Sequence, residues 1–212
     1  MRLFVALVPP EEALEHLAAF VEPRRDAGGP LRWTDPAQWH LTLAFMGHAP
    51  ERVLDDLHVR LARVCSRHAP LPLRFAGGGT FPAPYAARVV WAGVEHEGDG
   101  LRHLARGIRG VCAKAGAAPE GGPFRPHLTL ARCRRPVEAT RWLRVLEGYA
   151  GPAWTASEAT LVASHLGEGR GGRPRHEPLA SFPLGRVAAP APGDDGDRPR
   201  RPRQDSNLRP RD

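Results

Sequence analysis

Two copies of the tetrapeptide His-Leu-Thr-Leu place the same reactive side chains at two points of the chain. One copy carries His40 and Thr42, and the other carries His127 and Thr129. The alternation of leucine with these polar residues has the period of a β-strand, so each strand has one apolar face and one reactive face. Histidine and threonine then lie about 7 Å apart along the strand. Each copy therefore presents one titratable nitrogen and one hydroxyl on the same face.

A pair of imidazoles suits acid–base chemistry at phosphorus. The unperturbed imidazole pKa is about 6.5, so neutral and protonated forms coexist near neutrality. One histidine can take a proton from an attacking water or hydroxyl while the other protonates the leaving oxygen on the opposite side. The threonine hydroxyls would donate hydrogen bonds to the non-bridging phosphate oxygens. Arg132 ends the second copy nearby, although strict alternation directs it to the other face unless the strand is twisted or bulged.

The elements that must position these residues are predicted by hydrophobic periodicity. Strands are expected at residues 2–8, 31–34, 40–47, 71–81, 87–94, 127–132, 159–166 and 175–184. Helices are expected at residues 9–25, 50–68, 99–116 and 136–150. The second half roughly repeats the order of the first, which predicts an α+β fold of two pseudo-symmetric lobes with antiparallel sheets around a central cleft. The two His-Leu-Thr-Leu strands would face one another there.

The composition changes after residue 186. Residues 187–212 contain six arginines and five aspartates but almost no apolar side chains that could form a core. We expect a disordered Pro/Arg/Asp-rich tail at 187–212 and a folded bilobed domain at 1–186. An RNA-binding role for the tail arginines is an alternative, although the aspartates nearly cancel their charge.

Charge and cysteine content restrict the class of protein. The net charge of +7 admits a nucleic-acid partner, although Lys114 is the only lysine, and such arginine-rich usage also follows from a GC-rich genome. The three cysteines form no CxxC pair, which argues against a disulfide framework or a cysteine zinc site. No apolar run approaches the roughly 20 residues of a membrane span, so we expect a cytoplasmic protein without membrane contact.

Four segments together resemble a known family. HLTLAFMG and FRPHLTLAR, with MRLFVALVPP at the start and FPAPYAARVVWAGV between them, resemble the two-histidine (2H) phosphoesterases. They are most similar to the bacterial RNA 2′,3′-cyclic phosphodiesterases, also called 2′-5′ RNA ligase-like proteins, over residues 1–185. The resemblance implies metal-independent hydrolysis of 2′,3′-cyclic phosphate ends to 2′-phosphates, and in some members a reversible 2′-5′ ligation.

The resemblance also implies roles for individual residues. His40 would be the proton donor and His127 the proton acceptor. The strand geometry described above separately assigns Thr42, Thr129 and Arg132 to binding the substrate phosphate. No cofactor and no metal are implied. The expected partner is RNA that ends in a 2′,3′-cyclic phosphate, tRNA fragments included, and the protein would act as a monomer.

Three alternatives stay open on the sequence alone. The protein could grip RNA ends without turnover, or it could be a phosphodiesterase for a small cyclic nucleotide. Zinc binding by His40, His127 and His165 is the third alternative, although no HxH or HExxH spacing supports it. His176 stands where relatives often carry a tyrosine. Five aromatic residues are candidates for stacking on bases, or equally for core packing: Trp33, Trp39, Phe81, Tyr85 and Phe124.

Overall fold

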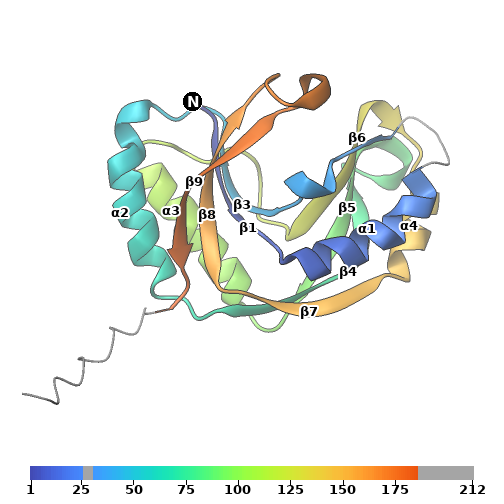
Figure 1. Ribbon diagram of the computed structural model, residues 1–212, viewed down its shortest axis with the longest axis horizontal. Coiled ribbons are helices and arrows are strands. Elements are labelled where there is room, and N and C mark those ends of the chain that lie inside the picture. The colour runs from blue at the N-terminus through green and yellow to red at the C-terminus, as the bar shows by residue number, and fades with distance from the viewer. Residues whose placement is uncertain (26–30, 186–212) are drawn as a thin grey trace, which may run out of the picture.

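Apolar strands alternate with amphipathic helices along the chain and assemble into one curled sheet with helices at both ends (Figure 1). The computed structural model describes residues 1–25 and 31–185, so the predicted tail at 187–212 lies outside the described residues. The strands are β1 (Leu3–Leu7), β2 (Arg32–Trp33), β3 (Leu41–Met46), β4 (Leu71–Phe81), β5 (Ala87–His96), β6 (His127–Val137), β7 (Ala150–Ala156), β8 (Glu158–His165) and β9 (Arg175–Pro183). The α-helices are α1 (Glu11–Arg25), α2 (Leu54–Cys65), α3 (Gly100–Lys114) and α4 (Thr140–Glu147).

The sheet joins two halves through its central strands. Its order is β7-β4-β5-β6-β3-β1-β8-β9, with β2 paired to β6, and every pairing in it is antiparallel. The two His-Leu-Thr-Leu strands, β3 and β6, are neighbours that pair at Leu41 and Leu128. The bilobed α+β prediction is confirmed, and the two lobes share one continuous sheet at this junction.

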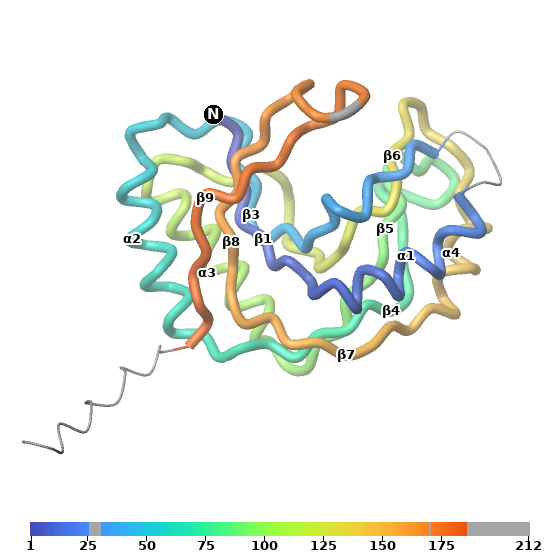
Figure 2. Tube along the Cα trace, in the orientation of Figure 1, coloured from blue at the N-terminus to red at the C-terminus, as the bar shows by residue number. Residues whose placement is uncertain are grey.

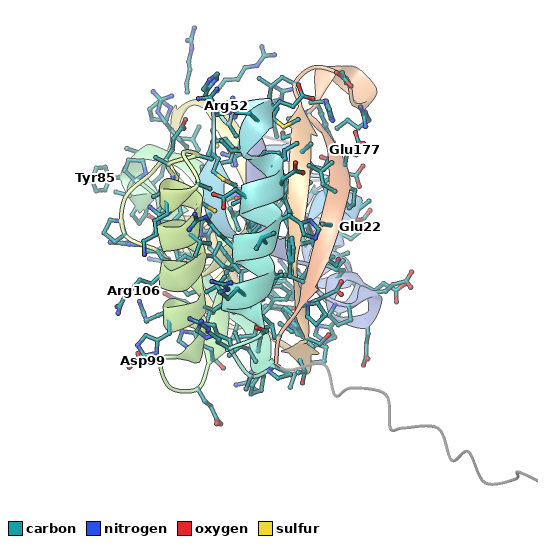
Figure 3. The ribbon with its side chains drawn as sticks, turned by 90° about the vertical axis from the view of Figure 1, so that its left-hand side faces the viewer. Glu22, Arg52, Tyr85, Asp99, Arg106 and Glu177 are labelled. Carbon is teal, nitrogen blue, oxygen red and sulfur yellow. The ribbon has the colours of Figure 1, made fainter. Side chains whose placement is uncertain are left out.

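Each half of the sheet has its own pair of helices. Helices α2 and α3 lie side by side over the half that contains β3 and β9, with Arg106 on the outer side of α3 (Figure 3). At the other end α1 packs on β7 and α4 packs on β4. Within residues 1–25 and 31–185, no helix is long and apolar enough to cross a membrane.

Both central strands carry a β-bulge at the same place in their motif. In β3, Ala44 pairs with Val5 and Thr42 pairs with Ala6, which leaves Leu43 as the extra residue. Two consecutive residues, Leu43 and Ala44, are buried there. The bulge shifts the alternation by one position, so Phe45 returns to the face that carries Thr42.

The bulge in β6 repeats this pattern. Ala131 pairs with Val90 and Thr129 pairs with Trp91, so Leu130 is the extra residue. Leu130 and Ala131 are both buried, and Arg132 follows them on the face of Thr129. The two halves are therefore related residue by residue through the reactive motif, which is the symmetry that the repeated tetrapeptide predicts.

Strand β7 has no counterpart among the predicted elements. It contains Gly151 and Pro152, which are both unfavourable in strand interiors, so the sequence pattern predicts no strand there. The strand is tolerated because β7 lies at the edge of the sheet and pairs only with β4. Trp154 of this strand is buried in the core and helps to hold β7 against the rest of the sheet.

Candidate active site

A cavity of about 650 Å³ lies on the reactive face of the two central strands. All five residues predicted for the site line it, namely His40, Thr42, His127, Thr129 and Arg132. The β8–β9 hairpin projects beyond β1 and β3 (Figure 2), and residues 164–176 supply part of the lining. The structure therefore brings the five side chains together in one cavity.

The bulge in β6 explains how Arg132 reaches the cavity. Strict alternation from His127 directs Arg132 to the opposite face, and the extra residue Leu130 reverses that direction. The displaced carbonyl of Leu130 accepts hydrogen bonds from the amide of Thr34 at 2.9 Å and from its hydroxyl at 2.8 Å. Through these hydrogen bonds Thr34 holds residues 34–40 against β6.

The two catalytic candidates share one local hydrogen bond. His40 Nδ1 lies 2.7 Å from the carbonyl oxygen of Gln38, and His127 Nδ1 lies 2.7 Å from the carbonyl oxygen of Arg125. A carbonyl can only accept, so Nδ1 is the protonated nitrogen in each neutral ring. The bond leaves Nε2 of each ring as the atom that can accept or donate a proton. Gln38 is itself held in place by its side chain, whose Nε2 donates to the carbonyl of Pro174 at 2.8 Å.

His40 lies against an apolar floor. Its ring stacks on Phe4 with 4.5 Å between ring centroids, and His176 meets both rings edge-on at 5.4 Å and 4.9 Å. Phe4 belongs to a small buried cluster with Ala6 and Val162, which is separate from the main core on the other side of the sheet. These contacts fix the ring plane of His40 and remove water from one side of it.

His127 has a different aromatic environment. Phe81 meets its ring edge-on at 5.0 Å, and Trp91 lies 6.0 Å away. The two halves therefore hold equivalent histidines with unequal neighbours, which allows unequal chemical roles.

Burial controls the protonation of the histidines in the site. Burial lowers the pKa of His40 to about 4, opposed by the hydrogen bond to Gln38 and assisted by the nearby His176 and Arg132. Burial also lowers the pKa of His127 and that of His176. Without an anion in the cavity these imidazoles are neutral at pH 7. A bound phosphate reverses this effect, because negative charge favours the imidazolium form.

The lining is rich in positive charge. Among the described residues that line the cavity, none is aspartate or glutamate, and the arginines are Arg2, Arg32, Arg132 and Arg173. Arg132 is an exposed residue of the lining, yet the surrounding protein partly desolvates its guanidinium and lowers its pKa. Without a carboxylate partner in the lining, these groups are available to an anionic substrate.

Sequence reasoning missed several residues of this site. The sequence predicts Arg2 and Phe4 only as part of the first strand, although the alternation of that strand places them together on one face. Gln38 and Thr34 act through hydrogen bonds across more than 90 positions of sequence, and no local pattern reports such contacts. Gln38 also lies two residues before His40, a spacing matched by Arg125 and His127.

The aromatic residues proposed to stack on bases differ in whether they line the cavity. Trp33 lines the cavity and meets Trp142 edge-on at 5.0 Å. Trp39 also reaches the cavity wall but is only 3% exposed, and its Nε1 donates to the hydroxyl of Thr34 at 2.7 Å. Tyr85 is 77% exposed and is not part of the lining. Trp33 is therefore the stacking candidate that the cavity can use.

The zinc alternative finds no support in the arrangement of side chains. Nε2 of His165 lies 2.9 Å from a carboxylate oxygen of Glu177, and His165 is not among the residues that line the cavity. Across the described part of the chain, no three His, Cys, Asp or Glu side chains are grouped so that they could hold a metal ion.

Comparison with known proteins identifies the family. The model of the 2′-5′ RNA ligase superfamily matches residues 8–168. The chain therefore belongs to this superfamily, as the repeated motif predicts.

Individual relatives carry a more specific name. A Thermus thermophilus protein named RNA 2′,3′-cyclic phosphodiesterase is 34% identical over 207 residues, which cover 92% of this chain and 98% of the relative. A Geobacillus stearothermophilus protein of the same name is 31% identical over 187 residues. That match covers 85% of this chain, and the chain spans 56% of the length of the relative.

Solved structures show the same fold. A crystal structure of a Thermus thermophilus protein superposes with a TM-score of 0.70 at 32% identity, covering 87% of this chain and 98% of the other. Escherichia coli LigT complexed with 3′-AMP superposes with a TM-score of 0.68 at 29% identity, covering 86% of this chain and 97% of LigT.

Proposed function

We propose that the protein hydrolyses the 2′,3′-cyclic phosphate at an RNA 3′ end to a 2′-phosphomonoester. The observation that carries this proposal is the pair of histidines, each locked through Nδ1 to a carbonyl two residues earlier and placed in one carboxylate-free cavity. Membership of the superfamily and the names of its relatives support the same activity.

The ring opening needs one proton removed and one proton supplied. Nε2 of His127 takes a proton from water as the water oxygen bonds to phosphorus. The bond between phosphorus and O3′ breaks, and Nε2 of His40 protonates O3′ as it leaves. One proton has then moved from His40 to His127, and exchange with solvent restores the starting state. The product keeps its phosphate on O2′.

The burial of His40 suits the donor role. An imidazolium whose pKa is near 4 in the substrate-free protein is a strong acid, and the incoming phosphate supplies the negative charge that allows it to hold a proton. His127 must be neutral to act as the base, and burial favours its neutral form. Protonation of His40 is thus coupled to substrate binding.

The remaining predicted residues stabilise charge on the phosphate. Thr42 and Thr129 occupy equivalent positions in the two halves, so their hydroxyls can donate to the two non-bridging oxygens. Arg132 adds a guanidinium on the His127 side. These donors supply the electrostatic role that a metal ion serves in other phosphodiesterases.

The same geometry serves ligation. If an RNA 5′-hydroxyl replaces water, the same two proton transfers form a 2′-5′ phosphodiester. We further propose that the substrates include tRNA fragments and that the protein acts as a cytoplasmic monomer.

The test is product analysis on a short RNA with a 2′,3′-cyclic phosphate end, incubated in ¹⁸O-labelled water. We expect one ¹⁸O atom in a phosphomonoester that phosphorus NMR assigns to O2′. His127→Gln should slow product formation roughly 10²- to 10⁴-fold, and His103→Gln, which changes an exposed histidine on α3, should not. Tight binding without turnover would instead identify a module that grips RNA ends. Faster hydrolysis of a 3′,5′-cyclic nucleotide would assign the cavity to a small cyclic nucleotide.

A further inference from the structure

Arg2 lines the cavity, and the ring opening described above does not use it. Its guanidinium carbon lies 5.0 Å from the centroid of the Phe45 ring. Its Nε atom is buried and has no hydrogen-bond partner among the described residues. None of the ion pairs found between described residues involves Arg2. Because Arg2 lines the cavity and its side chain makes no hydrogen bond or ion pair with a described residue, the guanidinium is available to an anionic ligand there.

The symmetry of the two halves gives Arg2 a counterpart. Phe45 follows the bulge of β3 at the position that Arg132 occupies after the bulge of β6. The first half therefore lacks an arginine on its own motif strand. Arg2 supplies one from the neighbouring strand, because Phe4 pairs with Phe45 and Arg2 lies diagonally across from that ring. Arg2 thus gives the first half a guanidinium beside its reactive strand, as Arg132 does in the second half.

Arg2 also belongs to the wall that holds His40. The backbone carbonyl of Arg2 accepts a hydrogen bond from the amide of Ser164 at 2.9 Å, and both residues line the cavity. Ser164 pairs with His176, whose ring contacts Phe4 and His40. Arg2 precedes Phe4 by two residues, which is about 7 Å along an extended strand. Arg2 therefore lies on the same cavity wall as His40, one same-face position beyond Phe4, which stacks on His40.

We infer that Arg2, together with the hydroxyl of Ser164, forms a second phosphate subsite that binds the 5′-phosphate of the terminal nucleotide. This inference rests on the proposed function, in which the cyclic phosphate of the same nucleotide lies between the two histidines. The two phosphates of that nucleotide are separated by its ribose. The planar fork of arginine matches phosphate oxygens, and Phe45 holds the fork against rotation. The substrate is accordingly a chain end rather than an isolated nucleoside cyclic phosphate.

The sharpest test compares two substrates that differ by one phosphate. Adenosine 2′,3′-cyclic phosphate has only the reacting group, and its 5′-phosphorylated form adds the group assigned to Arg2. The measured quantity is the ratio of kcat/KM for the 5′-phosphorylated compound to that for the other. A charge-assisted hydrogen bond predicts a ratio of roughly 10 to 100 for the wild type. Arg2→Met, which keeps an apolar stem over Phe45, should bring the ratio close to one.

Control variants make the result specific to this arginine. Arg106→Met removes an exposed charge on α3 (Figure 3) and should keep the wild-type ratio. If circular dichroism shows that Arg2→Met does not fold, Arg2→Gln replaces it with the same expected loss of preference. Arg2→Lys should give an intermediate ratio, because lysine keeps the charge but lacks the fork.

The outcomes separate the subsite from the proposed function. A wild-type ratio near one, or an unchanged ratio in Arg2→Met, overturns the subsite while the ring opening stands. A loss of preference in Arg32→Met or Arg173→Met but not in Arg2→Met places the second phosphate elsewhere and also overturns it. Failure of the wild type to open either compound, or a short RNA with the same end, contradicts the proposed function instead.

Discussion

The burial of His40 predicts a specific loss of stability in acid. Its pKa falls from 6.5 to about 4 in the folded protein, so the unfolded chain binds this proton at a higher pH than the folded chain does. The free energy of unfolding therefore decreases as the pH falls through this window. A shift of this size corresponds to a loss of about 3 kcal/mol between pH 7 and pH 4 from His40 alone.

The perturbation that isolates this contribution is His40→Gln, which removes the titrating group. Other histidines with lowered pKa values, including His127 and His176, contribute in the same direction, so the wild-type curve alone does not suffice. The free energy of unfolding is measured by urea denaturation at several pH values between 4 and 7. Over this range the wild type should lose about 3 kcal/mol more than His40→Gln does.

His103→Gln is the matched control, because His103 is exposed and meets water in both states. Its curve should follow that of the wild type. If His40→Gln also follows the wild type, then His40 is not desolvated by Phe4 and its neighbours. That outcome would remove the coupling of its protonation to phosphate binding.

Three further predictions concern the phosphate site. Arg132→Met should lower kcat roughly 10²- to 10³-fold, the usual effect of losing one preorganised donor to a charged transition state, and wild-type kcat would exclude it from the site. Thr42→Val and Thr129→Val should each reduce kcat by about tenfold, since each removes one neutral hydrogen bond, and steady-state kinetics of both variants will show whether the two positions are equivalent. Turnover should survive excess EDTA, and a loss that added zinc, magnesium or manganese reverses would show that a metal takes part.

The repeated motif allowed the central site to be predicted because its information is local. Alternation of apolar and polar residues determines the face of each side chain, so His40 and Thr42 had to share a face, as did His127 and Thr129. The duplication also predicts two strands that face one another, whereas in the structure they are neighbours that pair at the centre of one sheet. Arg132 marks the limit of this reasoning, since its direction depends on a bulge.

The sequence signal of that bulge can be interpreted only when the strand pairing is known. Leu130 and Ala131 are consecutive apolar residues, and both are buried. Such a pair fits either the end of a strand or an extra residue in its ladder, and only the pairing with β5 distinguishes the two. The same ambiguity applies to Leu43 and Ala44.

Long-range contacts account for the other omissions. Gly151 and Pro152 disfavour an extended strand at β7, and the strand forms because it pairs with β4. Arg2 enters the cavity because β1 lies between β3 and β8, an order that no local pattern contains. The sequence therefore predicts which of these side chains share the cavity, but it does not predict most of the cavity walls.

Single-turnover ring opening by histidine variants tests the central claim most directly. The substrate is a short RNA with a 2′,3′-cyclic phosphate end, and the variants are His40→Gln, His127→Gln and the double variant. The two histidines act on one transition state, so each single change should slow the reaction roughly 10²- to 10⁴-fold. The double variant should be little slower than the slower single one, because residues that act as a unit are not additive. A folded single variant that opens the ring at the wild-type rate would contradict the two-histidine mechanism.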